Sequence, residues 1–289
     1  MDQIKVKTPA KINLTLEVLD KREDGFHNIQ SIMQTIDLYD YLTITVEEAD
    51  EQEIILFGTS DEIPYDNRNL VYKAAELFFS FLSEQEDSYF AEQKQRVNIN
   101  IEKNIPVSAG LAGGSTNAAG TLFGLNKIFR EVLPDKKLHE LCAQLGSDLN
   151  VCLTGGCLLA TGRGEVTEPL PFRENKVSLI KPVNLGISAK EAYTKYSLLE
   201  NKPDYDYTHK MIDSLKIGTD IKQFLYNDLE TAVFDDYDEL QTIKKLYPDS
   251  VMSGSGSTYF MLNKDVEETD GYWIKNGLKF IPDGVDVVE

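Results

Sequence analysis

The stretch PVSAGLAGGSTNAA, residues 106–119, combines glycines with hydroxyl side chains where a strand gives way to a helix. VNINIEKNIP (97–106) alternates apolar and polar residues and predicts the strand, and the residues after the stretch are typical of a helix. Glycines let a backbone approach an anion closely, and the first N–H groups of a helix add donors and a favourable dipole. The segment GLAGGST (110–116) therefore predicts an oligophosphate site.

This segment matches neither GxxxxGK[ST] nor GxGxxG, the two common phosphate-binding fingerprints. A glycine cluster alone is also compatible with a flexible turn that caps the next helix. We expect that helix to begin near Thr116, with the hydroxyls of Ser115 and Thr116 as donors. A β-branched side chain at Gly113 is expected to abolish phosphate binding and leave the fold intact.

The remaining pattern mixes strands and helices in both halves. Strands are predicted over 4–20, 28–58 and 177–182, around a glycine turn at 251–262, and in the glycine-containing stretch 151–165. Helices are predicted over 66–82 with Asp66 or Asn67 as the cap, over 138–148, and through most of 189–246. Residues 83–95 are polar and predict a solvated loop or a frayed helix end. Prolines near 165–176 favour an N-terminal lobe, 1–168, and a C-terminal lobe, 169–289.

The charge balance limits the possible partners. The 289 residues carry 48 Asp and Glu against 29 Lys and Arg, a formal net charge of −19. A field of that sign repels nucleic acid and anionic membranes, so we expect neither as a partner, and a phosphate site must build its positive potential locally. The start of the chain lacks the apolar core of a signal peptide, and no apolar run reaches the ~20 residues of a membrane span.

The three cysteines are too few and too unevenly placed for a disulfide framework, and the histidines make no zinc spacing with them. Cys152 and Cys157 lie in an apolar stretch, where we expect buried free thiols; the third cysteine is Cys142. These features favour a cytoplasmic protein. The oligomeric state stays open.

Three segments resemble, in order, the three motifs of the GHMP kinases: TPAKINL (8–14), PVSAGLAGGSTNAA (106–119) and MSGSGST (252–258). The resemblance spans nearly the whole chain and favours the phosphate loop over a simple turn. It implies an α+β fold of two lobes, in which the N-terminal lobe is similar to domain 2 of ribosomal protein S5 and the C-terminal lobe is α/β. It also implies ATP and Mg2+ as cofactors, with no metal ligand assigned.

KREDGFH (21–27) and ATGRGE (160–165) resemble one branch of the GHMP kinases more than the others. That branch uses ATP to phosphorylate the 2-hydroxyl of 4-diphosphocytidyl-2-C-methyl-D-erythritol in the non-mevalonate route to isoprenoid precursors. In this resemblance Asp148, which we place between an amphipathic helix and an apolar strand, matches the aspartate that accepts or orients the hydroxyl proton. Lys11 matches the lysine that pairs with it and offsets charge near the transferred phosphoryl group.

The resemblance also assigns residues to the two ligands. ATP contacts are expected from Asn69 and from Pro106, Gly110, Leu111, Ala112, Gly113, Gly114, Ser115 and Thr116. Substrate contacts are expected from Asn13, which lies on the same strand face as Lys11, and from Thr258. His27 is expected to hydrogen-bond the edge of the cytosine, and the rings of Phe26 and Tyr193 are expected to stack on it. A second glycine turn is expected to buttress the site with Ser253, Gly254 and Gly256.

The sequence departs from that branch after Asp148, where Leu149-Asn150-Val151 stands in place of a common V/I-P-F. We expect this change to alter the wall beside the catalytic carboxylate. Phe26 replaces a frequent tyrosine and keeps the stacking face.

Two alternative functions remain. One is a GHMP kinase of another alcohol, such as mevalonate, homoserine or a sugar, and the other is a catalytically idle nucleotide-binding homologue. His27 and the two rings argue against the first, because those substrates carry no base. The retained Lys11 and Asp148 argue against the second.

Overall fold

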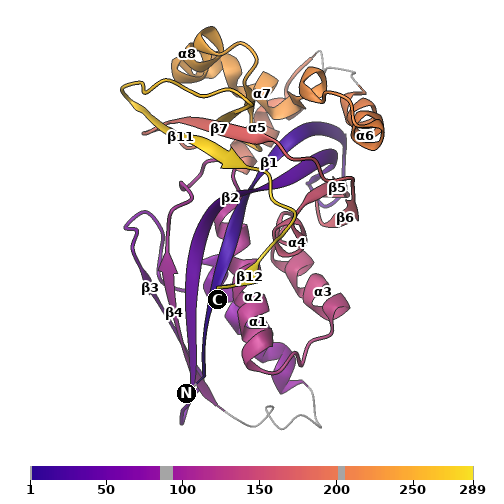
Figure 1. Ribbon diagram of the computed structural model, residues 1–289. Helices are drawn as coiled ribbons and strands as arrows, with labels where there is room; N and C mark the ends of the chain where they lie inside the picture. The colour runs from indigo at the N-terminus through magenta and orange to yellow at the C-terminus, as the bar shows by residue number, and fades with distance from the viewer. Residues whose placement is uncertain (1, 85–93, 201–205, 289) are drawn as a thin grey trace.

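The computed structural model describes residues 2–84, 94–200 and 206–288, and in these residues two lobes each combine a sheet with helices (Figure 1). The predicted α+β class with two lobes is confirmed. The polar segment predicted as a loop over 83–95 lies mostly outside the described residues. Among the described helices, none has both the length and the apolar composition needed to cross a membrane.

The larger sheet is built around two long antiparallel strands, β1 (Asp2–Lys21) and β2 (His27–Glu48). The strand order is β12-β1-β2-β4-β3, with β5 also paired to β2, β6 to β5 and β8 to β1. The other strands are β3 (Glu53–Gly58), β4 (Gln95–Glu102), β5 (Cys157–Thr161), β6 (Val166–Pro169), β8 (Tyr226–Asn227) and β12 (Asp286–Val287). The β1–β2 register shifts between Asn13 and Thr15, and such bulges re-aim side chains near functional sites.

Four helices pack on this sheet: α1 (Leu70–Ser83), α2 (Gly113–Ile128), α3 (Asp135–Leu145) and α4 (Leu149–Thr154). Helix α2 lies against β1 and β2 because two glycines on its buried face allow a close approach. A Cβ on Gly120 would lie 2.4 Å from Cγ2 of Thr8, and one on Gly124 would lie 2.6 Å from Cδ1 of Ile44. The depth of α2, and with it the position of its N-terminus, is set by this contact.

Three local predictions about these helices are wrong. Helix α1 is capped by Asn69, whose side-chain oxygen accepts from the N–H of Val71, rather than by Asp66 or Asn67. Helix α2 begins at Gly113, before the expected Thr116. The first part of the stretch 151–165 belongs to α4 and only Cys157–Thr161 is a strand there, because a short apolar run suits a buried helical turn as well as a strand.

The smaller sheet has the order β11-β7-β10-β9. Its strands are β7 (Lys176–Pro182), β9 (Val251–Met252), β10 (Tyr259–Leu262) and β11 (Tyr272–Lys279). Its lobe adds the helices α5 (Ala189–Ser197), α6 (Tyr207–Ile217), α7 (Asp228–Val233) and α8 (Asp238–Leu246) and the 3₁₀ turns η1 (Lys222–Phe224) and η2 (Phe234–Asp236). Apolar residues of α5, α7 and α8 form one core with this sheet.

The two lobes meet along the middle of β1. Ala10, Ile12 and Leu14 are fully buried in a cluster with Leu179 and Phe260 of the smaller sheet. Because side chains alternate along a strand, Lys11 and Asn13 lie on the opposite face. The division at residue 168 stays a prediction, and β8 and β12 from beyond it pair with β1 in the larger sheet.

The three cysteines are buried and free, which confirms the prediction for Cys152 and Cys157. Cys142 and Cys152 belong to the core beneath the helices, and Cys157 belongs to the core between the lobes. Burial raises the pKa of each thiol to about 12. The described residues contain no group of three or more His, Cys, Asp and Glu side chains placed to hold a metal ion.

Candidate functional site

A cavity of about 1010 Å³ lies between the lobes at the N-terminus of α2. Its walls come from β1, the turn between β1 and β2, the phosphate loop (110–116) and the start of α5. Most predicted site residues line it: Lys11, Asn13, Phe26, His27, Asn69, Pro106, Gly110, Ala112, Gly113, Gly114, Ser115, Asp148, Tyr193 and Gly254. This volume is at the upper end of the ~300–1,000 Å³ of a ligand site, so it can hold two small ligands.

The cavity is basic, although the protein as a whole is acidic. Its described lining contains one carboxylate, that of Asp148, and five cationic side chains, those of Lys11, Lys21, Lys103, Arg163 and Lys190. The N-terminus of α2 adds the positive end of a helix dipole. The local positive potential that a phosphate site requires is therefore present despite the net charge of −19.

Lys11 and Asp148 meet in the cavity wall. The Nζ of Lys11 lies 3.4 Å from Oδ2 of Asp148 and donates to Oδ1 of Asn13 at 2.7 Å. The amide of Asn13 in turn donates to Oγ of Ser31 at 2.9 Å. Lys11 is 3% exposed, whereas 29% of the Asp148 side chain is exposed. The ammonium is thus fixed by two partners, and the carboxylate keeps a side open to a ligand.

Asp148 immediately precedes α4, and not a strand as predicted. Its carbonyl accepts from the N–H of Cys152 at 3.1 Å, which brings the backbone into the helix. Its side chain makes no capping hydrogen bond. The carboxylate is therefore directed to Lys11 and the cavity rather than to its own helix.

The residues after Asp148 do not form the cavity wall, so that expectation is wrong. Leu149, Asn150 and Val151 are buried in α4, and none of them lines the cavity. The amide of Asn150 donates to the carbonyl of Glu165 at 2.9 Å. This departure from the family pattern changes the packing behind the site and not the surface that a ligand meets.

The phosphate loop presents free backbone donors. Ala112 adopts a left-handed conformation (φ 60°), and its carbonyl accepts the N–H of Thr116 at 2.9 Å. The N–H groups of Gly113, Gly114 and Ser115 precede that first helical bond and have no acceptor within the helix. All three residues line the cavity, so these donors are available to an anion.

The two glycine turns pack backbone to backbone. Gly110 has φ +74°, and a Cβ there would lie 1.9 Å from the carbonyl oxygen of Ser253. The hydroxyl of Ser253 donates to the carbonyl of Gly110 at 3.0 Å and accepts from the N–H of Asn13 at 3.4 Å. The 252–258 turn therefore ties the phosphate loop to β1.

Gly113 lines the cavity, but a side chain there would point toward Lys103, so we expect a β-branched residue to strain the loop as well as to weaken phosphate binding. A Cβ on Gly113 would lie 2.7 Å from Nζ of Lys103 and 3.2 Å from Cγ2 of Ile105. Lys103 is held by Oδ2 of Asp40 and by the carbonyl of Ile105, each at 2.6 Å. Desolvation by burial lowers the pKa of Lys103, although its contact with Asp40 acts in the opposite direction. Gly114 is the open position, since a Cβ there would meet only Cδ1 of Leu70 at 3.9 Å.

An aromatic wall closes the other end of the cavity. The rings of His27 and Tyr193 stack with centroids 5.5 Å apart and planes at 16°. Nε2 of His27 lies 3.2 Å from Oγ of Ser197, which donates to the carbonyl of Tyr193 at 2.9 Å. Burial raises the pKa of Tyr193, so its phenol stays protonated and neutral. Phe26 stands at the edge of this wall with 53% of its surface exposed.

Five predicted residues lie behind the cavity wall: Leu111, Thr116, Ser253, Gly256 and Thr258. Thr116 and Thr258 are fully buried, so the structure does not bring their hydroxyls to a ligand. The carbonyl of Leu111 accepts from the N–H of Lys11 at 3.2 Å, a contact that serves the site indirectly. The amide of Asn69 lines the cavity and is also bonded to Pro64 and Val71.

Several lining residues were not predicted: Lys21, Lys103, Ser108, Asn117, Ser147, Arg163, Lys190, Ser197 and Ser255. Lys21 and Arg163 lie inside KREDGFH and ATGRGE, the two segments that the sequence analysis singled out, so their neighbours carried a signal. Lys190 lies three residues before the predicted ring of Tyr193 on α5, at helical spacing. No local pattern marks Lys103, because its role depends on the distant Asp40.

The comparisons with known proteins agree with this geometry. Residues 69–156 match the model of the GHMP kinases N terminal domain. The chain is 40% identical over 278 residues to a 4-diphosphocytidyl-2-C-methyl-D-erythritol kinase of Clostridioides difficile, covering 93% of this chain and 89% of that protein. It is also 40% identical to the protein of that name from Caldicellulosiruptor bescii, over 89% of this chain and 88% of the other.

Solved structures give the same picture. The fold matches a crystal structure of 4-(cytidine 5'-diphospho)-2C-methyl-D-erythritol kinase with a TM-score of 0.71 and 27% identity, over 96% of this chain and 99% of the other. The fold also matches a homoserine kinase from Cytophaga hutchinsonii with a TM-score of 0.72, over 100% of this chain and 98% of the other. At 15% sequence identity, this match shows a similar fold alone. By its identity to these relatives over most of its length, the chain belongs to the 4-diphosphocytidyl-2-C-methyl-D-erythritol kinase family of the GHMP kinases.

Proposed function

We propose that this chain transfers the γ-phosphoryl group of ATP to the 2-hydroxyl of 4-diphosphocytidyl-2-C-methyl-D-erythritol. The observation that carries the proposal is a single cavity with three features on its walls. These are the Lys11–Asp148 pair, the open N-terminus of α2 and the stacked rings of His27 and Tyr193. A nucleoside diphosphate alcohol and ATP together need all three, and the names of the relatives point to the same substrate.

The proposed chemistry depends on position and charge more than on covalent steps. The phosphates of ATP bind the N–H groups of Gly113, Gly114 and Ser115 at the positive end of α2. The carboxylate of Asp148 accepts or orients the proton of the attacking hydroxyl. Lys11 holds that carboxylate in place and offsets the negative charge that gathers as the phosphoryl group moves.

The base-binding end supports cytidine over a substrate without a base. A pyrimidine gains stacking energy from a nearby aromatic face, about 1–3 kcal/mol by alanine substitution. His27 offers both a donor and an acceptor nitrogen according to its tautomer, as the edge of cytosine requires. Mevalonate, homoserine and simple sugars carry no base to stack on these rings or to bond His27.

Mg2+ belongs to this proposal, and the donors in the cavity fit it. Mg2+ at phosphoryl-transfer sites binds through one or two carboxylates together with substrate phosphates and water, not through a full protein cage. The cavity offers the carboxylate of Asp148 and the hydroxyl of Ser115 beside the phosphate loop. These two groups would hold the ion, which when bound neutralises charge on the phosphates.

The remaining expectations about partners stay predictions. We expect a cytoplasmic enzyme with a small-molecule substrate. The net charge of −19 remains our reason to expect no nucleic-acid or membrane partner.

A phosphoryl-transfer assay with purified protein and a panel of acceptors tests the proposal. We expect ADP release with 4-diphosphocytidyl-2-C-methyl-D-erythritol, and only background release with mevalonate or homoserine. Faster transfer to an acceptor without a base would favour the alternative alcohol kinase. No transfer to any acceptor, with ATP still bound, would favour the idle homologue.

A further inference from the structure

Two segments far apart in the sequence, KREDGFH (21–27) and ATGRGE (160–165), meet at the edge of the cavity. The guanidinium carbon of Arg163 lies 5.1 Å from the centre of the Phe26 ring. Both residues line the cavity. The Phe26 ring is 53% exposed and belongs to none of the hydrophobic clusters formed by the described residues. Its contact with Arg163 is therefore the main restraint on its orientation.

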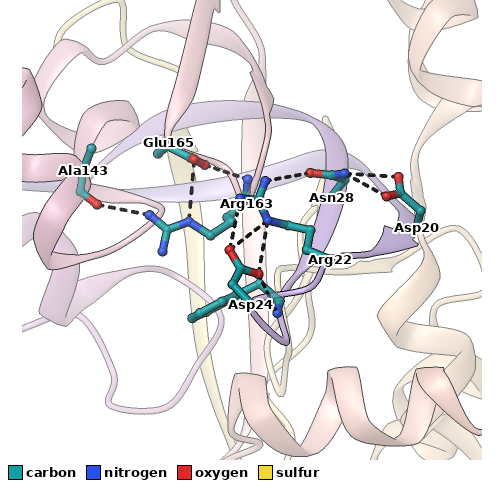
Figure 2. A network of polar contacts seen from close by, with 8 residues as sticks. Asp20, Arg22, Asp24, Asn28, Ala143, Arg163 and Glu165 are labelled. Carbon is teal, nitrogen blue, oxygen red and sulfur yellow. Dashed lines mark hydrogen bonds and ion pairs between the residues drawn. The ribbon is translucent and has the colours of Figure 1, made fainter.

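Arg163 is also held by polar contacts with Ala143 and Glu165, as Figure 2 shows. One of its terminal nitrogens, Nη2, donates to the carbonyl of Ala143 in α3 at 3.3 Å, and its Nε lies 3.6 Å from Oε1 of Glu165. Its backbone N–H donates to Oε2 of Glu165 at 2.6 Å. Asn150 holds the carbonyl of Glu165 from α4. The guanidinium is thus anchored to the helical layer, and its charge also attracts the carboxylate of Asp24 in the turn that carries Phe26.

The turn that carries Phe26 is shaped by its own polar contacts (Figure 2). Arg22 pairs with Asp24, the carboxylate of Asp24 accepts the N–H of Phe26 at 3.1 Å, and Arg22 also donates to Asn28 at 3.0 Å. Asp24 and Phe26 are exposed, and exposed ion pairs contribute little to rigidity. These contacts define the shape of the turn, whereas Arg163 attaches it to the body of the protein.

We propose that Arg163 is a positioning residue for base recognition, which holds the ring of Phe26 as a stacking surface at the cavity edge. This inference rests on the proposed cytidine substrate. The guanidinium covers one face of the ring through a cation–π contact and leaves the other face for a base. Arg163 thereby links the two sequence segments that distinguish this branch, since each supplies one half of the contact.

Arg163→Met keeps most of the side-chain length and removes the cation. An exposed cation–π contact corresponds to about a two- to fivefold change in an equilibrium constant. We expect the Kd of CDP, measured by calorimetry, and the KM of the cytidine substrate to rise about two- to fivefold. The Kd of ATP is expected to stay constant, and kcat to change less than KM. Arg163→Lys retains a cation and should recover most of the affinity.

Arg96→Met is the matched control. Arg96 is an exposed arginine that pairs with Glu53 on the outer part of the sheet and does not line the cavity. It should leave the Kd of CDP unchanged. An equal effect of Arg96→Met and Arg163→Met would overturn the inference.

Phe26→Leu distinguishes positioning from direct contact with the ligand. If Arg163 acts through the ring, Arg163→Met weakens CDP binding in the wild-type background and adds no further loss in Phe26→Leu. If the guanidinium touches the ligand phosphates instead, the two losses multiply, and the inference is wrong.

A reporter on the ring tests the inference without any ligand. The chain has one tryptophan, Trp273, so Phe26→Trp in a Trp273→Phe background places a single indole at position 26. Arg163→Met should lower the fluorescence anisotropy of this indole and increase its quenching by acrylamide. Unchanged anisotropy and quenching would refute the restraint. Failure of the wild-type protein to bind CDP, with the reporter responding as expected, would contradict the proposed substrate only.

Discussion

Gly110→Ala tests whether the phosphate loop depends on backbone-to-backbone packing. The new Cβ would lie 1.9 Å from the carbonyl oxygen of Ser253, and the residue would keep a left-handed φ of +74°. An L-residue in that conformation costs about 1–2 kcal/mol. Overpacking against backbone, which cannot rotate away, adds about 1–3 kcal/mol. Together these terms predict a loss of about 2–5 kcal/mol in the free energy of unfolding.

Gly114→Ala is the matched variant, because its Cβ has no contact closer than 3.9 Å. Replacement of a helical glycine by alanine stabilises by about 0.5–1 kcal/mol, so this variant should not lose stability. Its methyl group would enter the cavity where the phosphates approach the loop. We expect the Kd of ATP to rise about tenfold or more, equivalent to roughly 1.4 kcal/mol.

Differential scanning fluorimetry and calorimetry with ATP measure both variants. A change of 1 kcal/mol shifts Tm by about 2–4 °C in a protein of this size class, so Gly110→Ala should melt about 4–20 °C lower. A Gly110→Ala protein with an unchanged Tm would refute the packing of the two glycine turns. Wild-type ATP affinity in Gly114→Ala would refute the phosphate role of the loop.

Three other perturbations address the support beneath the site, the buried thiols and the base-binding wall. Lys103→Met leaves Asp40 buried without its cation and should lower the free energy of unfolding, measured by chemical denaturation, by about 3–5 kcal/mol. The double variant Lys103→Met, Asp40→Asn should recover part of that loss, and an unchanged denaturation midpoint in the single variant would contradict the role of the pair. Burial raises the pKa of each thiol from 9.0 to about 12, so between these pH values the folded state keeps protons that the unfolded state loses. The contribution of the buried thiols to the free energy of unfolding is therefore complete below pH 9 and is lost as the pH rises to 12. Between pH 9 and 12 each thiol makes the free energy of unfolding fall by about 1.4 kcal/mol per pH unit, so Cys157→Ala should make this fall shallower by that amount. The same slope in Cys157→Ala and the wild-type protein would argue against burial of this thiol. His27→Ala should weaken binding of a cytidine diphosphate ligand by about 1–3 kcal/mol and leave ATP binding unchanged; equal losses for both ligands would exclude a role for His27 in base recognition.

The sequence was sufficient for the fold class and for fourteen of the residues that line the cavity, whereas the other lining residues were not predicted. Two glycine-rich motifs with backbone-dictated roles predicted the phosphate loop and the second glycine turn, and the family resemblance predicted the pair of Lys11 and Asp148. Lys11 and Asp148 are far apart in the chain, yet the resemblance brought them together and the structure places them 3.4 Å apart. Residues whose chemistry depends on a local motif were therefore predictable.

The misses share a physical cause, which is dependence on distant partners. Lys103 owes its position to Asp40, far away in the chain, so no local pattern marks it. Arg163 lies in ATGRGE, which the sequence does mark, but its contact with the carbonyl of Ala143 in α3 depends on the fold. The direction in which Gly113 faces was also not predictable, since it depends on where Lys103 lies beneath the loop. A short apolar run such as that of α4 carries no periodicity that separates a helix from a strand.

The turnover of Asp148→Asn tests the central claim most directly. Asparagine is nearly isosteric and keeps the packing before α4, but it has no negative charge to accept or orient the proton. Removal of a general base typically costs ~100- to 10,000-fold in rate, about 3–5 kcal/mol of barrier. In the transfer of phosphate from ATP to 4-diphosphocytidyl-2-C-methyl-D-erythritol, kcat should fall about 100-fold or more, while the Kd of the acceptor and the Kd of ATP measured without Mg2+ change little. A folded Asp148→Asn enzyme with wild-type kcat would contradict the catalytic role of this carboxylate and the mechanism built on it.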